Sequence, residues 1–160
     1  MSEETWRYGT DPLQKLHTYY LTICTYEHLC TLGTITPRGF INLSTWGLEV
    51  SRTMPTISMS NPDIRIDHYV IMPNHVHLIL SSKSLLEKKI REYVLDWKDT
   101  TSRQMHRAHA AKRPIWDSSF TLDYIRNKAT YQAVLSFIHE NPKKWQYDKF
   151  YSKTFSPYHS

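Results

Sequence analysis

Residues 69–80 read YVIMPNHVHLIL, an apolar segment that carries two histidines near its middle. Successive side chains of a β-strand point to opposite faces, so His75 and His77 share one face while Val76 and Leu78 share the other. Two imidazoles about 7 Å apart on one strand face can reach a common ion. Ordinary hydrogen-bonded histidines are the alternative, but a His-x-His pair inside an apolar strand favours metal binding.

The length of 160 residues fits a single domain, 1–160, with a buried core. The sequence contains no run of 18 apolar residues, so no membrane span is predicted. The polar N-terminus is not typical of a signal peptide. Cys24 and Cys30 match no zinc or redox spacing, and free thiols predict a cytoplasmic protein. Lys and Arg number 20 against 15 Asp and Glu, with 11 Tyr and 5 Trp, which favours a polyanionic partner with unpaired bases.

Side-chain periodicity predicts alternating strands and helices. The expected elements are a strand at 17–26, a loop with a short extended piece at 34–43, a helix at 44–54 capped by Ser44, extended structure at 63–68 and 69–80 around a Met-Pro-Asn interruption at 72–74, a helix at 84–105, one further strand, and a helix at 128–140 that stops before Asn141-Pro142. This order predicts an α+β fold, a ferredoxin-like antiparallel sheet with helices on one face.

The histidine strand resembles the HUH motif (His, hydrophobic residue, His) of the single-tyrosine transposases, and it is most similar to the REP-associated tyrosine transposase branch. The resemblance continues in IWDSSFTLDYIRN (115–127) and YQAVLSFIHENPKKW (131–145), so it spans residues 17–150. It implies that the histidines lie on a central strand. It also implies cleavage and rejoining of single-stranded DNA beside a hairpin, with a divalent metal such as Mg²⁺ or Mn²⁺. A tyrosine oxygen would attack the scissile phosphate, leaving a 5′-phosphotyrosine and a free 3′-hydroxyl.

The family's nucleophilic tyrosine lies four residues before the Asn of the Asn-Pro pair, which is Phe137 here. Phenylalanine has no oxygen and cannot form the phosphotyrosine. Three explanations remain: a deliberate Tyr→Phe change, a natural loss of catalysis with DNA binding retained, or use of another tyrosine. Tyr131 is the fallback, although six residues place it about 120° around the helix from Phe137. Tyr124 precedes the helix and is a weaker candidate.

The resemblance also suggests further site residues. Asn141 follows Phe137 by one helical turn and is expected as a third metal ligand, with His139 and Glu140 as substitutes. The alternative for Asn141 is an ordinary residue that ends a helix before a proline. Lys98 matches a helix lysine of the family and is expected to contact a phosphate. Further phosphate contacts are expected from basic residues around the turn before the last helix, for which solvated surface charge is the alternative: Lys112, Arg113, Arg126 and Lys128.

Two functions from different classes are therefore expected. The first is a transposase that cleaves and transfers DNA strands, with this chain cleavage-deficient because of Phe137. The second is a non-catalytic protein that binds DNA hairpins. An RNA-binding module is disfavoured because no RNP1-like run occurs, and a hydrolase because no His-Glu-x-x-His occurs. A monomer and a homodimer are both compatible with the sequence, and the helix that carries residue 137 can act in cis or in trans.

Overall fold

The computed structural model describes residues 16–84 and 87–153. Two residues of the helix expected at 84–105, Leu85 and Leu86, therefore lie outside the described residues, as do the ends of the expected domain. Within the described ranges the strands and helices are β1 (His17–Cys24), β2 (Gly33–Ile35), β3 (Ile41–Leu43), α1 (Thr45–Thr53), α2 (Thr56–Met59), β4 (Ile64–Met72), β5 (His75–Ser82), α3 (Glu87–Ala108), β6 (Thr121–Ile125) and α4 (Lys128–Glu140), with short 3-10 turns at Tyr26–His28 and Trp145–Tyr147.

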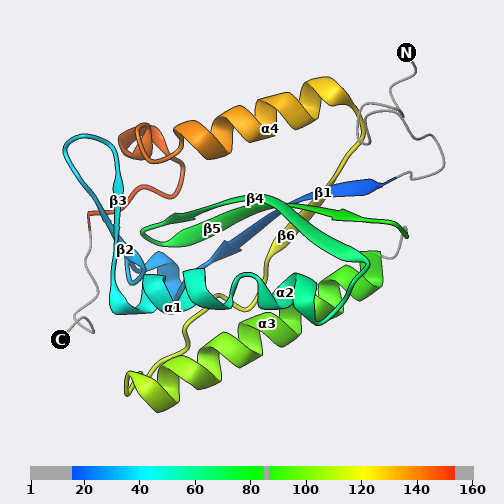
Figure 1. Ribbon diagram of the computed structural model, residues 1–160. Coiled ribbons are helices and arrows are strands. Elements are labelled where there is room, and N and C mark those ends of the chain that lie inside the picture. The colour runs from blue at the N-terminus through cyan, green and yellow to red at the C-terminus, as the bar shows by residue number, and fades with distance from the viewer. Residues whose placement is uncertain (1–15, 85–86, 154–160) are drawn as a thin grey trace.

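The main sheet has the strand order β4-β5-β1-β6, and each neighbouring pair is antiparallel. Together with the helices between β1 and β4 and between β5 and β6, this order gives a ferredoxin-like β-α-β-β-α-β arrangement. The expected α+β fold with an antiparallel sheet is confirmed, and the histidine strand β5 is a central strand. The helices lie on both faces of the sheet (Figure 1) and not on one as predicted, because α4 buries its own apolar side chains against the face opposite α1 and α3. The extended piece expected within 34–43 is one arm of a separate hairpin formed by β2 and β3.

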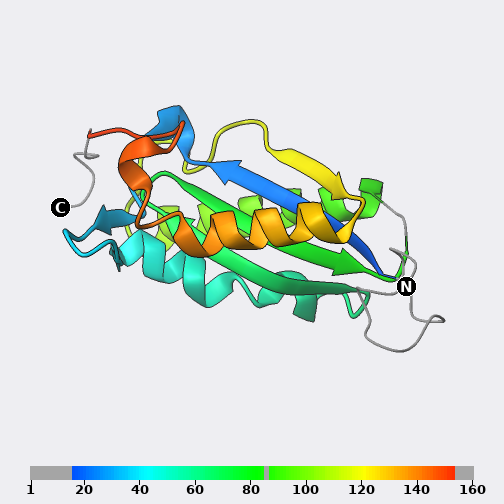
Figure 2. The same cartoon turned by 90° about the horizontal axis from the view of Figure 1, so that it is seen from above.

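The helices lie in two layers about the sheet (Figures 1 and 2). Helices α1, α2 and α3 lie on one face, where the larger apolar core is found, while α4 crosses the other face. Val76, Leu78 and Leu80 are fully buried in the core beneath α1 and α3. A smaller cluster beneath α4 contains Ile79 and Ile138. The histidines therefore face α4, the helix that carries Phe137.

Local sequence explains how α1 begins. The Ser44 hydroxyl accepts a hydrogen bond from the Gly47 amide at 3.1 Å, so Ser44 caps the helix as expected. Glycine is usually unfavourable inside a helix, but here it permits close packing. A Cβ atom at position 47 would lie 2.0 Å from the Leu32 carbonyl oxygen. Gly47 therefore lets α1 pack directly against the backbone before β2.

Candidate metal centre

His75 and His77 lie at the start of β5, just after the tight turn that joins β4 to β5. Their ring centroids are 4.6 Å apart, and both side chains are buried. Neither Nε2 atom has a hydrogen-bond partner within the described ranges. Buried polar nitrogen atoms normally have a partner, so this pair has the geometry of a site for an additional group.

Asp148, seven residues after Asn141, completes a cluster with the two histidines. One ligand atom from each of the three residues lies within 4.8 Å of the others. The Asp148 Oδ2 atom is 3.5 Å from His75 Nε2, at the outer limit of a hydrogen bond. Burial alone would raise the pKa of Asp148, but hydrogen bonds from Asn141 and the Phe150 amide, together with the neighbouring His75, hold that pKa well below its usual range. The carboxylate is therefore ionised and faces the imidazoles.

Asn141 ends α4 and points its amide into the same space. Its Nδ2 donates to Asp148 Oδ2 at 2.6 Å, while its buried Oδ1 has no hydrogen-bond partner among the described residues. The orientation leaves one amide oxygen beside the carboxylate and the two imidazoles. Asn141 lies where the sequence predicts a third ligand, and its role as one stays a prediction.

The donor set fits a divalent cation. Two imidazoles and one carboxylate are common ligands of Mn²⁺ and Zn²⁺, and the Asn141 amide oxygen adds a hard ligand of the kind that Mg²⁺ and Mn²⁺ accept. Burial and the neighbouring His75 lower the pKa of His77 to about 3, so its ring is neutral at physiological pH. A neutral ring can offer a nitrogen lone pair to a metal.

Phe137 lies beside this cluster, on the side of α4 that faces His77. Its ring centroid is 5.4 Å from that of His77, the ring planes meet at 65°, and 46% of the side chain is exposed. Phe137 therefore faces the histidines from the position where the family has its tyrosine. Tyr131, the fallback nucleophile, lies about 9 Å further back along α4 and packs in the cluster beneath that helix. Tyr124 hydrogen-bonds His17 and packs on Tyr19, on the opposite face of the sheet.

The expected DNA contacts do not gather at the histidines. Lys98 is buried on α3, beneath the other face of the sheet, where its amine donates to the Asp117 carbonyl at 2.7 Å. Burial lowers the pKa of this amine. Lys128 begins α4, about 20 Å from the end at Asn141. Their roles in binding DNA stay predictions, as do those of the other exposed basic residues: Lys112, Arg113 and Arg126.

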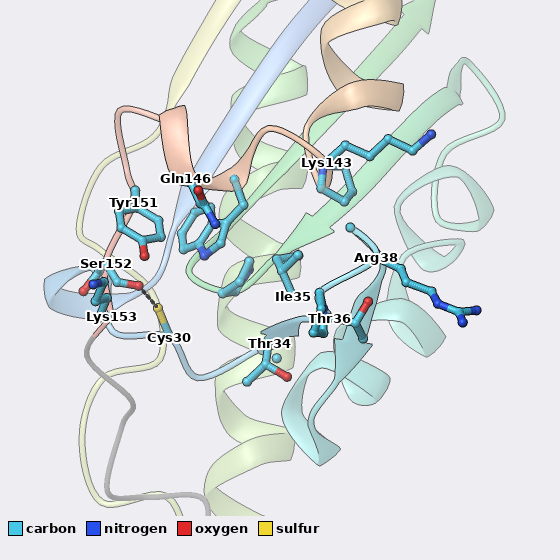
Figure 3. A pocket seen from close by; sticks show the side chains of 16 residues that line it. Cys30, Thr34, Ile35, Thr36, Arg38, Lys143, Gln146, Tyr151, Ser152 and Lys153 are labelled. Atoms are coloured by element: carbon cyan, nitrogen blue, oxygen red, sulfur yellow. Dashed lines mark hydrogen bonds between the residues drawn. The ribbon is translucent and has the colours of Figure 1, made fainter.

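A pocket of about 810 Å³ borders the metal centre. It lies between the β2–β3 hairpin and the segment that follows α4 (Figure 3), and its lining includes Trp145, whose ring centroid is 6.1 Å from that of His75. Arg38 and Lys143 extend outward on one side of the pocket, and Lys153 lies on the other. No acidic residue lines it within the described ranges. The charged side chains that line the pocket are therefore all basic.

Sequence reasoning missed Asp148 and the residues around this pocket. Asp148 lies in a segment without regular structure and has no fixed spacing to the histidines, so no sequence pattern indicates it. Asn74, which hydrogen-bonds His75, was also missed, although its position directly before the His-x-His pair could have indicated it. No helix in the described ranges is long and apolar enough to cross a membrane.

Comparison with known proteins gives consistent matches. The family described as "Transposase IS200 like" matches residues 43–141, well over half of the chain. An uncharacterized protein of Haemophilus influenzae is 27% identical over 152 residues, covering 83% of this chain and 84% of the relative.

Two solved structures share the fold. A REP-associated tyrosine transposase bound to a REP hairpin is 19% identical with a TM-score of 0.57, covering 83% of this chain and 70% of that one. A protein of Deinococcus radiodurans R1, described as a candidate transposase, is 19% identical with a TM-score of 0.53, covering 78% and 89%. The match over residues 43–141, which includes both histidines, Phe137 and Asn141, shows that the chain belongs to the IS200-like transposase family.

Proposed function

We propose that this chain binds single-stranded or hairpin DNA at a divalent metal centre, and that Phe137 prevents it from cleaving the bound strand. The observation that carries the proposal is the position of Phe137 beside an otherwise complete donor cluster of His75, His77 and Asp148. When bound, a divalent cation would polarise the scissile phosphate as a Lewis acid. His75, His77 and Asp148 would hold it, with the Asn141 amide oxygen available as a further ligand.

The surroundings of the metal centre support a nucleic-acid ligand. Lys149 lies over the Phe150 ring, 4.9 Å from its centroid, and Phe150 in turn packs on His75. The pocket next to it has basic residues on its rim and aromatic residues in its lining. Exposed cations neutralise backbone phosphates, and aromatic rings stack with unpaired bases. The solved REP-associated relative is bound to a REP hairpin, which favours a hairpin with unpaired flanks as the ligand here.

In a chain with tyrosine at position 137, the tyrosine oxygen would lose its proton and bond to the phosphorus. The bond between the phosphorus and the 3′-oxygen would break, and the 3′-oxygen would take up a proton to leave as a hydroxyl. The phosphodiester bond energy would be retained in the 5′-phosphotyrosine, so rejoining would need no nucleotide cofactor. Phenylalanine keeps the ring but supplies no nucleophile. Binding without cleavage is the expected behaviour of the present chain, and cleavage with strand transfer is the expected behaviour of Phe137→Tyr.

The proposal is tested with DNA hairpins selected for binding from a library with randomised stems and unpaired flanks. The purified chain should retain hairpins in preference to a perfect duplex of the same sequence. With Mn²⁺ present, the unmodified chain should form no covalent adduct. Phe137→Tyr should give a protein–DNA species that survives denaturing electrophoresis.

Two controls make the result interpretable. His77→Ala combined with Phe137→Tyr should bind DNA but form no adduct, which ties cleavage to the metal centre. Tyr131→Phe and Tyr124→Phe, each in the unmodified chain, locate the nucleophile if the chain already forms an adduct. An adduct in the unmodified chain would contradict cleavage deficiency. An inert Phe137→Tyr that binds both metal and hairpin would favour the alternative function, a DNA-hairpin-binding protein that has lost catalysis.

A further inference from the structure

The side chain of Asn74 fixes which ring nitrogen of His75 carries the proton. Its Nδ2 donates to two backbone carbonyls, those of His28 at 3.1 Å and Phe150 at 2.7 Å. Carbonyl oxygens only accept hydrogen bonds, so the amide orientation is determined and Oδ1 faces His75 Nδ1 at 2.8 Å. Because Oδ1 also only accepts, Nδ1 of His75 must be the protonated nitrogen. The lone pair of the neutral ring is then on Nε2.

His77 has an equivalent support from the neighbouring strand β1. Its Nδ1 atom is 2.8 Å from the Tyr20 hydroxyl and 2.9 Å from that of Thr22, the residue directly opposite it in the sheet. The Tyr20 ring also stacks on the His77 ring, with centroids 5.3 Å apart. Either hydroxyl can accept a hydrogen bond from a protonated Nδ1, as the Asn74 oxygen does at His75.

Both arrangements direct Nε2 toward the same buried space. The two Nε2 atoms have no hydrogen-bond partner among the described residues, and they lie with Asp148 inside a 4.8 Å cluster. We propose that Asn74 and the Tyr20–Thr22 pair are positioning residues that hold both histidines as Nδ1-protonated tautomers and aim their Nε2 lone pairs at one divalent cation. This inference rests on the metal dependence in the proposed function. It adds which residues set the geometry and protonation of the ligands.

Packing alone does not account for these contacts. A tyrosine and a threonine that only filled space would not need to bring two hydroxyls to one imidazole nitrogen. An asparagine held by two backbone carbonyls has little freedom to turn its oxygen elsewhere. Partners of this kind fix the tautomer and the ring orientation of metal-bound histidines, and their loss lowers metal affinity by about tenfold to a hundredfold.

The first measurement uses the metal-free protein. Nitrogen-15 NMR of the histidine rings should show Nδ1 protonated and Nε2 unprotonated in both His75 and His77. In Asn74→Leu the protonation pattern of His75 should change, and in the double variant Tyr20→Phe/Thr22→Val that of His77 should change. Nε2 protonated in both rings of the unmodified protein would overturn the proposal, whatever the variants do.

The second measurement is Mn²⁺ affinity, by calorimetry and by the electron paramagnetic resonance signal of the free ion. Asn74→Leu and Tyr20→Phe/Thr22→Val should each bind Mn²⁺ about tenfold to a hundredfold more weakly. Tyr20→Phe alone, which keeps the Thr22 hydroxyl, should lose less. Thr18→Val is the matched control because Thr18 lies on the same strand but hydrogen-bonds Ser81, and its affinity should be unchanged.

The outcomes separate this proposal from the function on which it rests. Unmodified protein that binds no Mn²⁺ would overturn both. Unmodified protein that binds Mn²⁺, with unchanged affinity in the folded variants, would overturn the positioning role alone. Circular dichroism establishes whether each variant is folded. If a variant is unfolded, the histidine tautomers of the unmodified protein decide whether the proposal holds.

Discussion

The Phe137 ring lies beside the His77 imidazole, with the two centroids 5.4 Å apart and the planes at 65°. The residue is 46% exposed, so its outer edge has room for an added hydroxyl without burying it. We expect Phe137→Tyr to change the free energy of unfolding by less than about 0.5 kcal/mol, as for other exposed positions. Urea denaturation monitored by tryptophan fluorescence measures this. A loss of several kcal/mol would mean that the ring is packed more tightly than its exposure indicates.

Gly47 is expected to be intolerant of any side chain. A Cβ atom there would lie 2.0 Å from the Leu32 carbonyl oxygen and 2.9 Å from a Leu43 methyl group, so α1 would have to move away from the backbone. We expect Gly47→Ala to destabilise the protein by about 3 kcal/mol, despite the better helix propensity of alanine. Leu48→Ala, at the exposed neighbouring position, is the control and should cost far less. A stabilised Gly47→Ala would show that α1 is not held this closely.

The sheet and its histidine strand follow from local sequence patterns. Alternation around His75 and His77 correctly placed Val76 and Leu78 in the core, and the Asn141-Pro142 pair marked the end of α4. Helix propensity does not explain the glycine at position 47 of α1, because a tertiary contact with the Leu32 backbone requires it. Propensity carries no information about which backbone will lie opposite a glycine.

The metal centre was only half predictable. The two histidines are indicated by spacing within one strand, whereas Asp148 reaches them from a turn after α4. The surroundings of Lys98 were also not predictable. A lysine on an amphipathic helix looks like a surface cation, but its amine donates to the Asp117 carbonyl inside the protein. Such contacts depend on how distant segments pack, which periodicity does not encode.

Both cysteines should be unreactive at neutral pH. Burial raises the pKa of the Cys24 thiol to about 11, with Asp117 adding to the effect, and burial raises that of Cys30 to about 11. The thiolate is the reactive form, so a rise of about two pKa units lowers its concentration about a hundredfold below pH 9. Alkylation by iodoacetamide, followed by mass spectrometry, should be slow at pH 7.5 and should accelerate up to about pH 11. Urea-unfolded protein is the control, and equal rates at pH 7.5 would contradict the prediction.

Asp148 is expected to contribute a large part of the metal affinity. Asp148→Asn keeps the shape but removes the negative charge that faces the two imidazoles, so Mn²⁺ affinity should fall by at least about tenfold. Asp63→Asn, an exposed change outside the cluster, removes the same charge and should leave the affinity unchanged. Calorimetric titration with Mn²⁺ measures both. Unchanged affinity in Asp148→Asn would assign the third ligand to another residue, with Asn141 the nearest available.

The last prediction concerns which cations contact DNA. Lys143 lines the pocket beside the metal centre, whereas Lys128 lies at the opposite end of α4. Both lysines are exposed, so replacing either with glutamine should leave the fold intact and remove one charge. Each phosphate contact to a single strand contributes about 0.7 to the slope of log affinity against log salt concentration.

We therefore expect Lys143→Gln to reduce that slope by about 0.7 with a selected hairpin, and Lys128→Gln to leave it nearly unchanged. Fluorescence anisotropy at four or more salt concentrations gives both slopes, with DNA sequence and metal held constant. The reverse result would place the bound strand along the start of α4 and restore the contact predicted for Lys128. Equal reductions would mean that the strand runs the length of the helix, because no single phosphate can reach two amines about 20 Å apart.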